Sequence, residues 1–226
     1  YWWHAQAIAF IVRFNPRTRR LLDDLRSRLL QVQARSRRRP SKAPSGLPPG
    51  AIAVHVRHGD KGAEMPLEPF ARHASAAEGL AAGDALPVLP PGLGGGVVYA
   101  FPAWRFAGRT MFLSTEDPEV VTEALAWGRA AWSVVHFREN RTNADVATMR
   151  RQRGYGRATL QSFLNLEAAL EADAWVCTLT SNWCQLIDEL RSTVGGKASA
   201  PFVNLAHAGY RHTAECVVFQ NCPEKK

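Results

Sequence analysis

The sequence predicts an α/β fold: a Rossmann-like, doubly wound parallel sheet with helices on both faces. Short apolar runs rich in β-branched residues alternate with longer segments of helical composition, and this alternation is typical of parallel sheets. The chain has 226 residues, of which 46% are hydrophobic, enough for one domain with a substantial core. No stretch approaches the length of a membrane-spanning apolar helix, so we expect no membrane contact in this part of the protein.

Residues 1–40 are expected to form a helical segment. Trp2–Arg13 is apolar enough for a buried helix, which would end at Asn15-Pro16. Arg17–Val32 carries leucines at helical spacing and predicts a second helix. Residues 41–50 are predicted to be a linker, since they continue a stretch rich in Pro and Ser. Because the chain starts at Tyr1 without a methionine, we expect it to be part of a longer protein.

The formal net charge of +8 belongs mainly to the first 50 residues, which hold 11 of the 28 basic residues and two of the 20 acidic ones. A single-stranded nucleic-acid site would combine such bases with aromatic side chains that stack on nucleobases. Between Arg17 and Gly50 there is no aromatic residue. We therefore expect a solvated basic helix face and linker, and no nucleic-acid partner.

Residues 51–58 (AIAVHVRH) predict a buried strand, because β-branched residues dominate the run and alternate residues share a face. On this pattern His55 and Arg57 lie on the same face. The run breaks at Gly59 into a short loop that carries Asp60, Lys61 and Glu64. A guanidinium can bind a phosphate through two hydrogen bonds, and Lys61 adds a point charge. The composition predicts an anion site; the alternative is an ordinary solvated charge cluster at a strand end.

The alternation of strands and helices continues through the domain that we assign to residues 51–212. Residues 74–108 are crowded with Ala, Gly and Pro, and we expect a low-complexity insertion on a surface loop. Asp117 predicts a helix N-cap, because Pro118 follows at the first helical position. The other expected elements are strands at Met111–Ser114, 133–137 and Ala174–Leu179 and helices at Leu160–Ala172 and Asn182–Leu190. Residues 213–226 are assigned as a C-terminal tail.

Three loops of this arrangement share the carboxyl edge of the sheet, where ligands bind in open α/β folds. They are Arg57–Glu64, Thr115–Asp117 and Thr180–Asn182. The helix start after Ser181 offers backbone N–H groups to an anion. Neither a glycine-rich dinucleotide fingerprint nor a P-loop is present, which argues against a dinucleotide oxidoreductase and a P-loop enzyme. Carboxylates do not cluster at metal-ligand spacing, so we expect no metal.

The four cysteines form two close pairs in the sequence, Cys177 with Cys184 and Cys216 with Cys222. An even count in close pairs is typical of disulfides in an oxidising compartment. A zinc site is the competing interpretation. It is disfavoured because the spacings are not C-x-x-C and no histidine follows at the usual interval.

Four sequence segments occur in a recognisable order: YWWHAQAIAFIVR, HVRHGDK with a glutamate three residues later, MFLSTEDPEVVTEA, and ADAWVCTLTSNWCQLIDEL. Together they resemble the GDP-fucose-dependent transferases related to the eukaryotic core α-1,6-fucosyltransferase and its bacterial Nod-factor counterpart. The resemblance covers most of residues 1–40, 50–68 and 110–212. It implies the donor-binding half of a GT-B-type glycosyltransferase, with an anchor and the first half of the catalytic region upstream.

The resemblance implies transfer of fucose from GDP-fucose to a glycan or glycoprotein acceptor with inversion, α-1,6 to the N-glycan core GlcNAc. Arg57 would stabilise the charge of the leaving β-phosphate. Glu64, aided by Lys61, would accept the proton of the acceptor hydroxyl, and Asp60 would hold the loop. No cofactor and no metal is expected. The alternatives are a protein O-fucosyltransferase-like enzyme and a non-catalytic GDP-sugar-binding domain.

The family's donor-binding residues match several further positions, which the resemblance implies as ligands of the nucleotide and phosphates: His55, His58, Glu116, Asp117, Asn165, Ser181 and Asn182. The resemblance also implies a disulfide between Cys177 and Cys184, and residence in the Golgi lumen as a type II membrane protein. Three departures stand out. His58 replaces the second of two arginines found in the core enzyme, the loop to Glu64 is one residue shorter, and Asn165 replaces an aspartate that accepts two hydrogen bonds from guanine. An amide has one acceptor oxygen and a donor, so guanine selectivity should fall.

Overall fold

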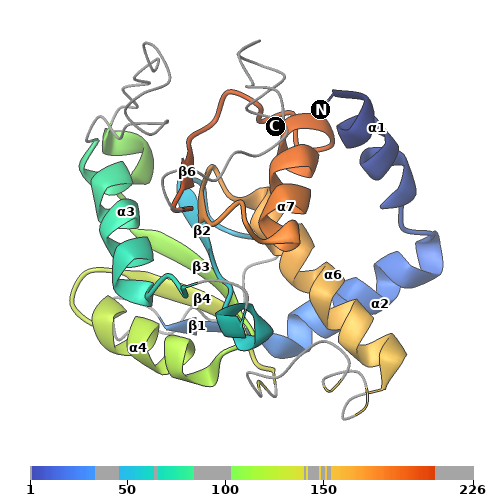
Figure 1. Ribbon diagram of the computed structural model, residues 1–226, viewed down its shortest axis with the longest axis horizontal. Helices are drawn as coiled ribbons and strands as arrows, with labels where there is room; N and C mark the ends of the chain where they lie inside the picture. Colours follow the sequence, from blue (N-terminus) through green and yellow to red (C-terminus); the bar gives the residue numbers. More distant parts are fainter. Residues whose placement is uncertain are drawn as a thin grey trace.

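A six-stranded sheet lies between two layers of helices in the computed structural model, which describes residues 2–33, 46–63, 66–83, 103–139, 141, 148, 151 and 154–206 (Figure 1). The strand order is β1-β4-β3-β2-β5-β6. All neighbours are parallel except β1, which pairs antiparallel with β4. The strands are β1 Leu30–Gln33, β2 Ala51–Val56, β3 Thr110–Thr115, β4 Ser133–Phe137, β5 Ala174–Cys177 and β6 Phe202–Asn204. The predicted α/β class with a mostly parallel sheet is confirmed, and the arrangement is consistent with a Rossmann-like fold.

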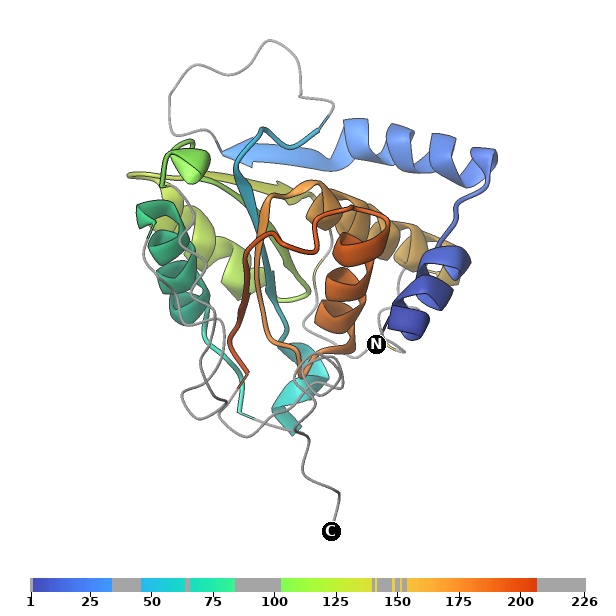
Figure 2. The same ribbon diagram turned by 90° about the horizontal axis from the view of Figure 1, so that it is seen from above.

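The helices divide between the two faces of the sheet. On one face lie α3 (Phe70–Ala82) and α4 (Pro118–Gly128); on the other lie α6 (Tyr155–Glu171) and α7 (Asn182–Thr193) (Figure 1). The alternation within β2 serves both layers, because Ile52, Val54 and Val56 belong to the core under α3 and α4, and Ala53 to the core under α6 and α7. Two further helices, α1 (Trp2–Ile11) and α2 (Pro16–Leu29), lie outside this second layer. Figure 2 shows α1 beside α7 and α2 along α6.

The order of the strands reverses at β2. Strands β3 and β4 follow on one side of β2, and β5 and β6 on the other. The loops that leave β2 and β5 at their carboxyl ends therefore run to opposite faces of the sheet and open a crevice between them, the usual place for a ligand in open α/β sheets.

The predicted burial of the first helix is wrong. Its side chains Trp3, Phe10 and Ile11 are 80%, 68% and 72% exposed, and Ala5 is its buried residue among those described. The helix contacts the domain mainly through α7, so only one narrow stripe is covered. Its apolar composition indicated burial, but composition carries no information about how many neighbours a helix has.

The second helix ends earlier than predicted, at Leu29, and the chain continues as β1. Leu30 is extended, with φ −64° and ψ 123°, and pairs with Phe137 across the antiparallel ladder. The ladder satisfies backbone groups and buries Leu30 in the core under α6 and α7, which outweighs the helical propensity of the segment. Within residues 1–40, the described part, 2–33, therefore contributes an edge strand to the sheet as well as helices.

The expected insertion at residues 74–108 begins too early, because residues 74–82 belong to α3. Alanine is the strongest helix former, and Ala74, Ala77 and Leu80 are buried against the sheet. Phe106, near the other end, is fully buried in the same core. The residues between, 84–102, lie outside the described part of the chain, as does the expected tail at 213–226.

The helix cap after β3 and the strand at 133–137 were predicted correctly. Asp117 is the N-cap of α4, its side chain accepts a hydrogen bond from Glu119 N at 2.8 Å, and Pro118 opens the helix. The strand predicted at 133–137 has those bounds in β4.

None of the helices that the structure describes is both long enough and apolar enough to cross a membrane.

Candidate functional site

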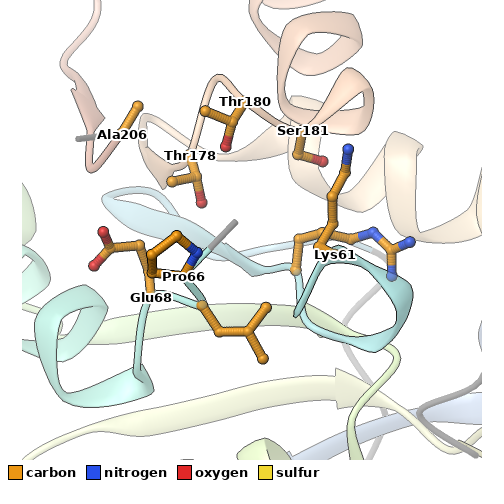
Figure 3. A pocket seen from close by; sticks show the side chains of 9 residues that line it. Lys61, Pro66, Glu68, Thr178, Thr180, Ser181 and Ala206 are labelled. Carbon is orange, nitrogen blue, oxygen red and sulfur yellow. The ribbon is translucent and has the colours of Figure 1, made fainter. Parts of the chain in front are cut away.

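A pocket lies in the crevice between the carboxyl ends of β2 and β5 (Figure 3). The space around it, open solvent included, is about 330 Å³. Its cavity volume is only about 20 Å³, well below the roughly 300–1,000 Å³ of small-molecule sites. Its walls come from the loop after β2, the segment before α3, the β5–α7 loop and the chain after β6: Arg57, Lys61, Pro66, Leu67, Glu68, Thr178, Thr180, Ser181 and Ala206.

Lys61 reaches the pocket because the chain turns sharply after β2. Gly59 has φ +56°, a conformation that favours glycine, and it opens the 3₁₀ turn Gly59–Ala63. A Cβ at this position would lie 2.8 Å from Nη1 of Arg57, so glycine also permits the close approach of the guanidinium. From this turn the Lys61 side chain extends toward Ser181 (Figure 3).

Ser181 marks the start of α7 on the opposite wall. It occupies the N-cap position, yet its hydroxyl makes no capping bond. Its backbone N–H donates to Thr178 O at 2.9 Å and closes a tight turn. The predicted disulfide between Cys177 and Cys184 is confirmed, and it ties the end of β5 to the first turn of α7. A helix start fixed in this way presents partial positive charge to the pocket.

Arg57 lines the pocket, but its guanidinium is already paired. Nη1 donates to Glu116 and Nη2 donates to Asp60. Glu116 also accepts a hydrogen bond from His58 N at 2.7 Å, so it anchors both the side chain and the backbone of this loop. Asp60 is 44% exposed at its side chain and is the more easily displaced of the two carboxylates. An anion that binds Arg57 through two hydrogen bonds must compete with these pairs.

His58 connects three segments behind the pocket. Its Nδ1 lies 2.8 Å from Oδ2 of Asp117, and its Nε2 lies 3.1 Å from the carbonyl oxygen of Glu68. Both partners are acceptors, so both bonds form together only when the ring donates from both nitrogens. His58 and Asp117 are absent from the described residues that line the pocket. Their geometry supports a structural bridge between the β2 loop, the start of α4 and the segment before α3.

His55 lies beneath the site. Its ring is buried, Nδ1 is 3.2 Å from Oγ of Ser114, and Nε2 has no hydrogen-bond partner in the described structure. Burial lowers the pKa of His55 to about 3, with smaller contributions from Arg57 and His73. The imidazole is therefore neutral at physiological pH, and it is absent from the described lining of the pocket.

Asn165 and Asn182 also lie apart from the described lining of the pocket. The amide of Asn165 donates to Glu139 and to the carbonyl oxygen of Gln161. Its Oδ1 is buried and has no hydrogen-bond partner among the described residues. Asn182 is the exposed first residue of α7. Glu64, the predicted base, lies outside the described residues, as do Cys216 and Cys222.

The pocket thus brings together three predicted residues, Arg57, Lys61 and Ser181, and adds others that sequence analysis did not identify. Glu68 is the most notable addition because it is a buried carboxylate. A glutamate between two prolines, Pro66 and Pro69, is the one local signal in the sequence that sets it apart. In the described part of the chain, no group of three or more His, Cys, Asp or Glu side chains is arranged to hold a metal ion.

No family model matches the chain, and no curated protein matches it. The functional assignment therefore depends on the residues and geometry of this pocket.

Proposed function

We propose that this chain is the GDP-sugar-binding half of a GT-B-type glycosyltransferase that transfers fucose from GDP-fucose to a glycan with inversion. The observation that carries the proposal is the pocket itself. It gathers a guanidinium, an ammonium and a helix start, from Arg57, Lys61 and Ser181, at the strand-order reversal of a parallel sheet. These are the groups that bind a diphosphate, and the four sequence segments described above favour GDP-fucose as its source.

The proposed reaction is a single displacement at the anomeric carbon. The acceptor oxygen forms a bond to this carbon while the bond to the β-phosphate oxygen breaks and its electron pair leaves with GDP. Negative charge grows on the β-phosphate, and Arg57 and Lys61 would stabilise it more in the transition state than in the ground state. The proton of the acceptor hydroxyl passes to a carboxylate, for which Glu64 is the candidate.

Binding of the diphosphate would rearrange the pairs of Arg57. Glu116 is largely buried and tied to the backbone of His58, so it would keep one side of the guanidinium in place. Asp60 is exposed enough to move into solvent and leave Nη2 to a phosphate oxygen. On this account the Asp60 carboxylate holds the Arg57 guanidinium in place before the donor binds. A phosphate oxygen of the donor then replaces this carboxylate as the partner of Nη2.

A non-catalytic GDP-sugar-binding domain is the second candidate, favoured by the two carboxylates that already pair with Arg57.

A protein O-fucosyltransferase-like enzyme would use the same donor and differ from the first proposal only in its acceptor. For the first proposal we infer α-1,6 transfer to N-glycan core GlcNAc in the Golgi lumen. The Cys177–Cys184 disulfide supports an oxidising compartment.

The test is a transfer assay in which the full-length protein, including the other half of the proposed transferase, receives GDP-fucose and a panel of N-glycan and peptide acceptors. We expect a fucosylated N-glycan, and we expect Glu64→Gln to abolish transfer while GDP binding persists. GDP binding without transfer to any acceptor would favour the binding domain. If the protein bound no GDP, the assignment would be wrong.

A further inference from the structure

Two segments of the pocket wall are joined by one side chain, that of Asn204 at the end of β6. Its Oδ1 accepts hydrogen bonds from Leu179 N and from Ala206 N, each at 3.0 Å. Ala206 lines the pocket, and Leu179 lies between the lining residues Thr178 and Thr180. In Figure 3 Thr178, Thr180 and Ala206 lie on the same side of the pocket. The side chain of Asn204 therefore ties together the two segments that form this side.

The two hydrogen bonds of Asn204 differ in range. The bond from Ala206 N spans two residues and closes a local turn of a kind that asparagine often forms. The bond from Leu179 N spans 25 residues and joins the chain after β6 to the β5–α7 loop. A carbonyl oxygen has two lone pairs, so these two N–H groups fill the capacity of Oδ1 as an acceptor. Both wall segments thus depend on a single atom.

The backbone of Asn204 is held in place by the sheet. Asn204 is the register partner of Cys177 in the parallel ladder between β5 and β6, and Leu205 N donates to Cys177 O at 2.8 Å. Cys177 also forms the disulfide to Cys184 in the first turn of α7. The Asn204 side chain therefore starts from a point at the carboxyl edge of the sheet that two paired strands determine.

The β5–α7 loop is held by backbone hydrogen bonds on both sides of Leu179. While Leu179 N donates to Asn204, Leu179 O accepts a hydrogen bond from Nε2 of Gln185 at 2.8 Å. Within the loop, Ser181 N donates to Thr178 O at 2.9 Å. These bonds determine where the loop places the start of α7, which carries partial positive charge. Groups that bind and orient a reacting ligand must be placed accurately, because a displacement of about 1 Å can lower the rate of reaction a hundredfold.

We propose that Asn204 is a positioning residue for the diphosphate of the nucleotide-sugar donor. By accepting from Leu179 N and Ala206 N with one oxygen, it sets the position of the α7 start across the pocket from Lys61. This inference rests on the proposed function. Asn204 itself makes no contact with the donor on this account, because its effect passes through the backbone of the β5–α7 loop.

The experiment is calorimetric titration of the full-length protein with GDP, paired with urea unfolding, for the wild type, Asn204→Ala and Asn204→Asp. Asn204→Ala removes the shared acceptor and should weaken GDP binding about tenfold. Asn204→Asp keeps an acceptor oxygen at the same reach and should restore most of the affinity. The titrations are made at about 0.5 M salt, where a Debye length of about 4 Å screens the added charge.

Asn15→Ala is the matched control. Oδ1 of Asn15 also accepts a backbone hydrogen bond, from Thr18 N at 2.9 Å, but it caps α2, which contributes no residue to the described lining of the pocket. This variant should lower the free energy of unfolding and leave GDP affinity unchanged. The control thus separates a loss of stability from a loss of position in the pocket wall.

Unchanged GDP affinity in Asn204→Ala, with or without a loss of stability, would overturn the inference and leave the proposed function standing. Affinity in Asn204→Asp as low as in Asn204→Ala would overturn it too, since the acceptor would then not be the cause. A wild-type protein that binds no GDP would overturn both proposals. If Asn204→Ala fails to fold, Asn204→Ser takes its place, because its oxygen lies one bond closer to the backbone and should give a similar fall in affinity.

Discussion

Removal of the Cys177–Cys184 disulfide should lower both the stability of the fold and the affinity of the pocket for GDP. The bond closes a loop with a sequence separation of seven residues. The chain-entropy treatment assigns about 2.5 kcal/mol of stability to a loop of this size. For a chain of this length, that corresponds to a fall in Tm of roughly 5–10 °C. The same bond fixes the start of α7 against β5, so GDP affinity should fall as well.

The assay is urea unfolding of the Cys177→Ala/Cys184→Ala variant, paired with GDP titration. Both sulfurs are buried, so the alanines also leave small cavities. Wild-type protein unfolded in the presence of a reductant serves as the control that loses the bond and keeps the sulfur atoms. Unchanged unfolding free energy in both samples would refute the stability argument. Unchanged GDP affinity in the variant would refute the role of the disulfide in positioning the start of α7.

Three further predictions follow from the charges at and beneath the pocket. Asp60→Asn should strengthen GDP binding about two- to fivefold, because GDP no longer has to break the partly exposed ion pair between Asp60 and Arg57. Weaker GDP binding in titration would show that Asp60 stabilises the loop instead. Lys61→Ala should weaken GDP binding and flatten its dependence on salt concentration, and an unchanged salt dependence would remove Lys61 from the site. Burial lowers the pKa values of His55 and His73 to about 3 and about 4, below the 6.5 of an ordinary histidine, so the unfolded chain binds more protons between these values. Their contribution to stability should be complete above about pH 6.5 and be lost as the pH falls toward 4. His73→Gln should reduce this slope in urea unfolding, and an unaltered slope would contradict the assignment.

Local signals in the sequence predicted much of the fold. The cap at Asp117 and the strand at 133–137 depend on residues within a few positions of each other, and both were correct. The strand at Leu30–Gln33 was missed because it forms only when β4 is beside it. The exposure of α1 was missed for the same kind of reason, since its neighbours come from distant parts of the chain.

In the candidate site too, local features could be predicted from the sequence, and contacts between distant segments could not. Alternation along β2 indicated which residues share a face, but it did not indicate that His55 is buried beside Ala169 of α6 and Ile187 of α7. Nor did it reveal that His58 contacts Asp117 and Glu68 rather than the pocket, because those contacts require the folded chain. Glu68 escaped notice since its burial results from the packing of the segment before α3.

The central claim is that Arg57 binds the diphosphate of a nucleotide sugar across the pocket from the start of α7. Titration of GDP and guanosine into the wild-type protein and Arg57→Ala tests it most directly, with Arg129→Ala, an exposed arginine at the end of α4, as the matched control. We predict that the wild-type protein binds GDP and not guanosine, that Arg57→Ala weakens GDP binding at least about tenfold, and that Arg129→Ala leaves it unchanged. Equal GDP affinity in the wild-type protein and Arg57→Ala would contradict the account.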